Sequence, residues 1–143
     1  MLKTMPFLVV PLLNEVNKMN KHEKGVLKLL KEEKYDEAAV QYILDLNHVS
    51  FLELRKFLEP YMPVDGDLAM GYPHYPKIRI WWNMSEEMWQ VVKKIMSHGK
   101  VELKPTPPLL YRMDGFVTKL PVVKRVYQYK TDRWLPMIFV KVV

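Results

Sequence analysis

The sequence predicts an α+β domain, and three patterns lead to that class. Between residues 20 and 59, and again between 85 and 98, apolar residues recur every three or four positions, which is typical of helices that pack through one face. The segment KIRIWW at residues 77–82 alternates as a half-buried strand does. After Gly99, prolines and glycines divide the chain into short apolar runs, which favours short strands.

The first twenty residues contain the longest apolar stretch, PFLVVPLL at residues 6–13. This stretch is too short to span a bilayer and carries two prolines. We expect a buried strand at residues 7–10, or a packed arm, followed by a short helix that begins at Pro11. No site of small residues for signal cleavage follows the stretch, and the chain has no cysteine, so the expected location is the cytoplasm.

Capping residues predict where the next two helices begin. Asn20 with Glu23 forms the start of a helix with Val26 and Leu30 on its apolar face. Asp36 is expected to cap the helix after it, because an apolar face follows at the spacing of a helix. That face consists of Ala39, Val40, Ile43 and Leu44.

Two serines predict the starts of two further helices. Ser50 with Glu53 forms a capping box, the strongest local signal in the chain, and the helix it opens must end by Pro60. Ser85 is expected to cap the second helix, which Gly99 terminates as the residue after the C-cap. Since capping already explains both serines, neither is assigned a catalytic role.

The other segments are assigned from turn signals and apolar runs. Residues 61–77 are expected to be a loop, because prolines and glycines punctuate them. We predict short strands at residues 101–104 and 109–113, the second followed by an Asp-Gly turn. Residues 121–129 and 134–143 are expected to form a hairpin, and the second of them is apolar enough for a buried strand.

The charge of the chain is divided unevenly. Residues 1–87 carry 11 Lys and Arg against 13 Asp and Glu, a net charge of −2, whereas residues 88–143 carry 11 against 3, a net charge of +8. Lys93 and Lys94 can be explained by the dipole of their helix, but two charges do not account for this excess. Such an asymmetry indicates a polyanionic or acidic partner for the basic part.

Aromatic residues lie among these cations. Arg125, Tyr127 and Tyr129 would share one face of a regular strand, and rings beside cations suit single-stranded nucleic acid, because rings stack on bases while cations contact phosphates. The alternative is an ordinary solvated edge. The candidate nucleic-acid contacts in this part are Lys93, Lys94, Lys100, Lys119, Lys124, Arg125, Tyr127, Tyr129, Lys130 and Arg133.

The segment ILDLNHVSFLELRKFL at residues 43–58 contains a short turn, Val49, the capping Ser50 and an amphipathic helix. It resembles the winged helix-turn-helix family, and the resemblance extends over residues 20–82. It implies that the second helix of the motif enters the major groove while a wing touches the DNA backbone. On that helix Arg55 and Lys56 could reach DNA, although neighbouring glutamates offset their charge. A three-helix scaffold or a dimer surface is the alternative for this segment.

The sequence therefore predicts one domain over residues 1–143. Residues 1–82 form a helical, winged-helix-like part, and residues 83–143 form a basic helix with a small antiparallel sheet and a C-terminal β-hairpin. The expected function is that of a small non-enzymatic nucleic-acid-binding protein. A regulatory role and a homodimer are both compatible with the sequence, and the sequence does not distinguish DNA from RNA as the partner.

Two other functions stay open. An interaction module or assembly subunit is supported by the apolar helix at residues 51–58 and by the Trp81–Trp82 pair. A hydrolase that uses His74 with a nearby aspartate has less support, since the four histidines are scattered and no glycine-rich phosphate loop occurs. No catalytic residue, metal site or cofactor is predicted.

Overall fold

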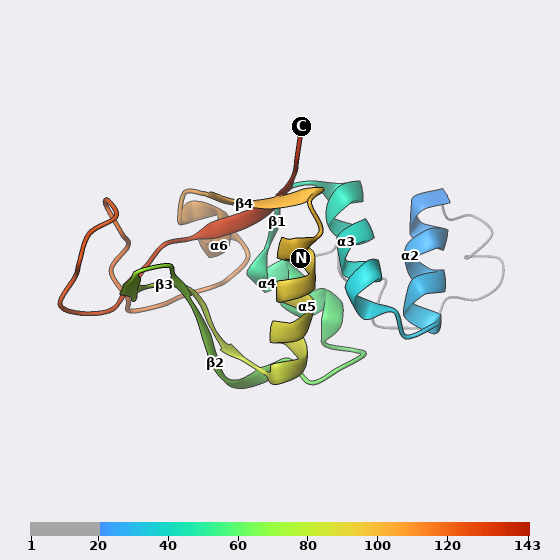
Figure 1. Cartoon of the computed structure of the whole chain (residues 1–143), viewed down its shortest axis with the longest axis horizontal. Helices are drawn as coiled ribbons and strands as arrows, with labels where there is room; N and C mark the ends of the chain where they lie inside the picture. The colour runs from blue at the N-terminus through green and yellow to red at the C-terminus, as the bar shows by residue number, and fades with distance from the viewer. Residues whose placement is uncertain (1–20) are drawn as a thin grey trace.

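The computed structural model describes residues 21–143 and confirms the α+β class. Within that range, five helices accompany two small three-stranded sheets. Figure 1 shows α2 and α3 at one end of the molecule and a long loop that projects at the other end. The expected strand at residues 7–10, the helix from Pro11 and the Asn20 cap lie outside the described residues.

The first two described helices pack on each other through small and branched side chains. Helix α2 spans Lys21–Lys31 and α3 spans Tyr35–Leu46. Val26 and Leu30 of α2 are buried, as are Ala39 and Ile43 of α3. The prediction that Asp36 caps α3 is wrong, because the helix begins one residue earlier and Asp36 lies in its first turn. The carboxylate there still interacts favourably with the positive end of the helix dipole.

The two serine caps are confirmed. Helix α4 spans Phe51–Leu58, and the Glu53 N–H donates to Ser50 Oγ at 3.0 Å. Helix α5 spans Glu86–Ser97, and the Met88 N–H donates to Ser85 Oγ at 3.0 Å. Gly99 follows the C-cap of α5 with φ of +85°, a conformation that glycine adopts without a steric penalty.

The first sheet joins distant parts of the chain. Strands β1 (Val49–Ser50), β6 (Met137–Lys141) and β4 (Val101–Pro105) lie in the order β1-β6-β4, and both pairs are antiparallel. The predicted strand at residues 101–104 is confirmed, as is a buried strand within residues 134–143. Because β1 belongs to the helical part and β6 to the basic part, the two parts share one sheet.

The second sheet corrects the prediction of a loop at residues 61–77. Strand β2 (Asp65–Tyr72) and strand β3 (Tyr75–Met84) form an antiparallel hairpin, and β5 (Arg133–Trp134) pairs parallel to β3. The expected strand at residues 77–82 is confirmed inside β3. Gly66 permits β2 to pass close to the start of α5, since a Cβ there would lie only 2.7 Å from the Cα of Ser85.

Two further predictions in the basic part are wrong. Residues 109–113 form helix α6 (Leu109–Met113) and not a strand. Residues 121–129 form no strand, so the C-terminal hairpin does not exist; only Val122 makes an isolated bridge, to Trp134. The physical reason is that β6 is the central strand of its sheet, with β1 and β4 on its two edges. No edge of β6 remains for residues 121–129.

The core is rich in aromatic rings. Trp81 contacts the rings of Phe51, Tyr111 and Phe116, and Trp134 contacts Tyr111 edge to face. The Tyr111 hydroxyl donates to the carbonyl of Met137 on β6 at 2.6 Å and accepts from the Phe51 N–H at 3.1 Å. This buried phenol therefore connects the sheet to the first turn of α4.

The same burial removes the support for the interaction surface suggested at residues 51–58. Phe51, Leu54, Phe57 and Leu58 are all buried, so the apolar face of α4 belongs to the core. Trp81 is buried as well, and Trp82 is half-buried.

Candidate nucleic-acid interface

The cations of the basic part fall into two groups in the fold. Lys93, Lys94 and Lys100 lie on α5 or just after it, and α5 runs through the middle of the molecule. The second group lies on residues 119–133, here called the basic loop, which projects from one end of the molecule (Figure 1). In this view the basic loop lies apart from α5.

The α5 group is only partly available to a ligand. Lys94 Nζ lies 3.8 Å from Asp36 Oδ2, an ion pair between exposed side chains that offsets part of its charge. Lys93 Nζ lies 5.8 Å from the centre of the Trp89 ring, a cation–π distance, and remains exposed together with Lys100. All three ammonium groups are exposed at this end of α5, and two of them, those of Lys93 and Lys100, have no carboxylate partner among the described residues.

In the basic loop, two arginines each lie over a tyrosine ring. The guanidinium carbon of Arg125 is 4.7 Å from the centre of the Tyr127 ring, and that of Arg133 is 4.5 Å from the centre of the Tyr129 ring. The two rings meet edge to face, with 5.5 Å between their centres. Stacking on a ring holds a guanidinium in place while the N–H groups at its edge can still donate to a phosphate.

Hydrogen bonds within the loop fix the position of Tyr129. Its hydroxyl donates to the carbonyl of Arg125 at 2.7 Å, and its N–H donates to the carbonyl of Tyr127 at 3.1 Å. Gln128 Nε2 donates to the carbonyl of His74 at 3.0 Å, which joins the loop to the tip of the β2–β3 hairpin. Part of the ordering cost of the loop is therefore met before any ligand binds.

The loop encloses a concave surface with a volume of about 590 Å³. Four cations and two tyrosines line it together with two uncharged polar residues. The lining residues are Lys124, Arg125, Tyr127, Gln128, Tyr129, Lys130, Thr131 and Arg133. No carboxylate belongs to this lining in the part of the chain that the structure describes.

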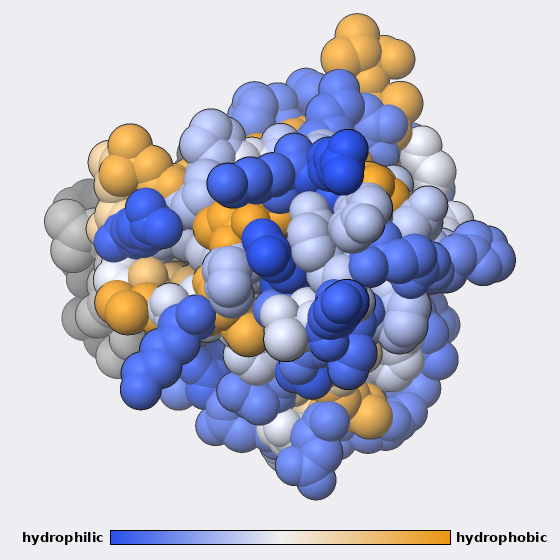
Figure 2. Space-filling view, turned by 90° about the vertical axis from the view of Figure 1, so that its left-hand side faces the viewer, coloured by the Kyte–Doolittle hydropathy of each residue, from blue (hydrophilic) through white to orange (hydrophobic). Residues whose placement is uncertain are grey.

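The electrostatics of the loop favour an anion. Residues 119–133 contain five Lys and Arg and one acidic residue, Asp132. That carboxylate pairs with Arg79 of β3, with 3.1 Å between Asp132 Oδ2 and the Arg79 guanidinium. Within residues 21–143, none of the five loop cations lies in an ion pair. Figure 2 views the side from which the loop projects, and hydrophilic side chains cover most of that face.

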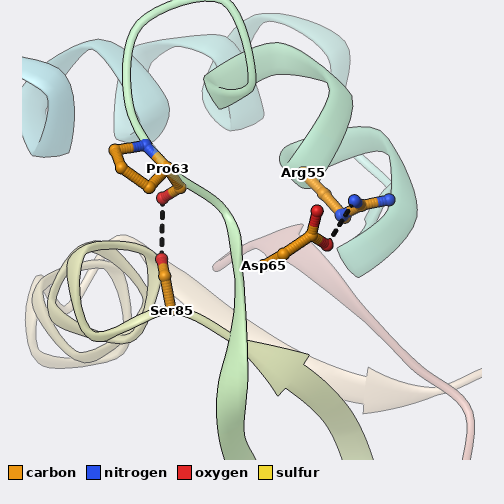
Figure 3. A network of polar contacts seen from close by, with 4 residues as sticks. All are labelled: Arg55, Pro63, Asp65 and Ser85. Carbon is orange, nitrogen blue, oxygen red and sulfur yellow. Dashed lines mark hydrogen bonds and ion pairs between the residues drawn. The ribbon is translucent and has the colours of Figure 1, made fainter.

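The residues expected on the reading helix at 51–58 are placed differently. Arg55 is half-buried and pairs with Asp65 at the start of β2, as Figure 3 shows beside the hydrogen bond from Ser85 to Pro63. Lys56 is half-buried on the same helix. With its arginine paired and its apolar face in the core, α4 offers little to a phosphate backbone.

Sequence reasoning missed three parts of this interface. Gln128 and Thr131 line the concave surface, and the Arg79–Asp132 pair neutralises the acid of the loop. The Arg79–Asp132 contact crosses 53 positions of the chain, so no local pattern could reveal it. Interleaving of Lys and Arg with Tyr was the signal that did identify the loop.

The comparisons add no relative. No family model, no curated protein and no solved structure matches this chain. Within residues 21–143, no helix has the length and apolar character needed to cross a bilayer. Among the same residues, no group of three or more His, Asp and Glu side chains is placed to hold a metal ion.

Proposed function

We propose that this protein binds nucleic acid through the basic loop, with a preference for single strands at that site. The carrying observation is the pair of arginine–tyrosine stacks in a concave surface without a carboxylate. Arg125, Arg133 and the loop lysines would contact phosphates, and the exposed ring of Tyr127 would stack on a base. Lys119, exposed at the start of the loop, extends the cationic surface.

The expected salt dependence follows from the number of cations. Five phosphate contacts on a single strand give a slope of about −3.5 for log Kobs against log[salt]. Affinity should then fall by roughly 10²-fold between about 50 and 200 mM salt. Lys93 and Lys100 would make the slope steeper if the same strand reached α5.

The test is fluorescence anisotropy with a labelled single-stranded DNA, the matching RNA and a duplex, each measured over a salt series. We expect binding to weaken steeply with salt and to be lost when Arg125 and Arg133 are both changed to Glu. A matched control changes Lys28 and Lys31 of α2 to Glu, since both lie outside the loop. Absence of binding to all three nucleic acids at low salt, or equal losses in the two double variants, would refute the proposal.

The order of the elements also favours the winged-helix resemblance, but in a register that differs from residues 43–58. Helix α5 leads into β4, and β4 and β6 flank residues 106–136, which include the basic loop. In this register α5 would be the second helix of the motif and residues 106–136 would be the wing. The exposed residues Gln90 and Lys93 of α5 would then face a duplex. Lys93→Glu should weaken binding to duplex DNA more than to a single strand.

A further inference from the structure

A second concave surface lies at the junction of α3, α4 and α6, and it has a different chemistry. Its volume is about 600 Å³. Three large apolar side chains on its lining are exposed: Leu46 at 40%, Leu109 at 61% and Met113 at 77%. Leu109 and Met113 are four residues apart on α6, so they lie on the same face of that helix. We call this surface the α6 groove.

The α6 groove is acidic in a protein with a net charge of +6. Glu53 and Asp114 both line it, and no Lys or Arg does so among the described residues. Both carboxylates also act on the buried phenols beside them, and the pKa of Tyr42 and of Tyr111 is raised by burial first and by these two charges in addition. The groove therefore has a negative local potential.

The end of α3 adds to that potential. Leu46 is the last residue of α3, and the last turn of this helix carries no basic residue, whereas α2 and α5 each have lysine in their last turns. The carbonyl end of a helix attracts cations. A positive group in the groove would meet Asp114 and the negative end of the α3 dipole together, while Glu53, which is 3% exposed, would act on it from beneath the surface.

The rim of the groove is held in place by the turn after α3. Asn47 and His48 both have positive φ, at 53° and 56°. Asn47 Oδ1 accepts from the N–H of Lys141 on β6 at 2.9 Å and from the N–H of His48 at 3.1 Å. These bonds fix the turn, so the apolar and acidic groups of the groove are positioned before a ligand binds.

We propose that the α6 groove binds a peptide segment of a partner protein that presents apolar side chains next to a Lys or Arg. Apolar side chains would cover Leu109 and Met113, as an amphipathic helix does in a hydrophobic groove. The cation would lie beside Asp114 and the end of α3, and this charge match selects the segment. The proposal is independent of nucleic-acid binding, which the basic loop would carry.

The test is selection of random peptides of about 12 residues, displayed on phage, against the full chain. Enriched sequences should combine Leu, Ile, Met or Phe with Lys or Arg. The best sequence is then synthesised and titrated against variants. Met113→Lys and Leu109→Lys should each weaken binding by about tenfold or more, because they remove an apolar contact and repel the cation.

Val117→Lys is the matched control, since Val117 is 88% exposed and does not line the groove. It adds the same charge and should change peptide affinity less than about twofold. Asp114→Asn should weaken the peptide by about three- to tenfold, and should have no effect on a peptide in which the cation is replaced by Met. All four variants should retain the wild-type circular dichroism and melting temperature.

Selected peptides that bind Met113→Lys as tightly as wild type would overturn the proposal, and so would enrichment of acidic sequences or of none. A dimer that Met113→Lys dissociates would also overturn it, because a second copy would then occupy the groove. Nucleic-acid affinity should not decrease in Met113→Lys, so failure of this proposal is distinguishable from failure of the proposed function.

Discussion

Replacement of Tyr127 separates base stacking from charge at the basic loop. Tyr127 is 51% exposed, Arg125 lies over its ring at 4.7 Å, and Tyr129 meets that ring edge to face. A base can therefore stack on the part of the ring that remains exposed. Since stacking of a base on an aromatic ring is worth about 1–3 kcal/mol, Tyr127→Ala should weaken single-strand binding by about 5- to 150-fold.

The salt series distinguishes this loss from a loss of charge. Tyr127→Ala should change the slope of log Kobs against log[salt] by less than about 0.7, the contribution of one phosphate contact. Lys124→Ala should make the slope less negative by about that amount, and it should affect affinity less at high salt than at low salt. Tyr127→Phe keeps the ring and should bind within about twofold of wild type.

Val126→Ala is the control for the Tyr127 variants, because Val126 is the adjacent residue and is 45% exposed but has no ring. Its affinity should equal that of wild type. If Tyr127→Phe binds as weakly as Tyr127→Ala, the hydroxyl and not the ring is responsible. If Tyr127→Ala binds as wild type does, the stacking role is refuted.

Four other perturbations follow from the Arg79–Asp132 ion pair and the buried phenols. Asp132→Asn should raise affinity for single-stranded nucleic acid about threefold at low salt. Arg79→Ala should lower this affinity by a similar factor, because Asp132 loses its partner. Anisotropy measures both, and affinities equal to that of wild type would contradict the electrostatic argument. Tyr111→Phe should lower the free energy of unfolding by about 2–4 kcal/mol in urea titrations, because two buried backbone groups lose their partner. A loss below about 0.5 kcal/mol would show that the phenol does not join β6 to α4. Stability should fall as the pH rises above about 10, since Tyr42 and Tyr111 ionise near that value in the unfolded chain, while burial raises their pKa in the folded protein. Below pH 10 the phenols are neutral in both states, and their contribution to the free energy of unfolding is complete. Above pH 10 this free energy should fall by up to about 1.4 kcal/mol per pH unit for each phenol. Urea titrations that give the same free energy of unfolding at pH 9 and pH 11 would contradict this expectation.

Local signals predicted the parts of the fold that local chemistry determines. Ser50 and Ser85 could be identified as caps because a serine hydroxyl satisfies an N–H group only three residues further on. Gly99 ended α5 for an equally local reason, its freedom to adopt positive φ. Neither inference needs to know what the rest of the chain contacts.

The hairpin of β2 and β3 could not be predicted in this way. The segment DGDLAMGY has two glycines and two aspartates, residues that strands disfavour, and it becomes a strand because β3 pairs with it. The short apolar run at residues 109–113 is equally compatible with strand and helix, since five residues are too few for a period to be read. In both cases tertiary contacts decide the local structure.

The absence of a C-terminal hairpin explains how the basic loop is built. Residues 121–129 find no free edge on β6. Backbone hydrogen bonds to Trp134 hold only the start of this segment, at Pro121 and Val123, so side chains contribute to holding the rest. Tyr129 does so: its hydroxyl is bonded to the backbone of Arg125, and Arg133 covers its ring. The two tyrosines that looked equivalent in sequence therefore have different roles. Tyr129 is a positioning residue, and Tyr127, whose hydroxyl makes no such bond among the described residues, is the ring that a base can reach.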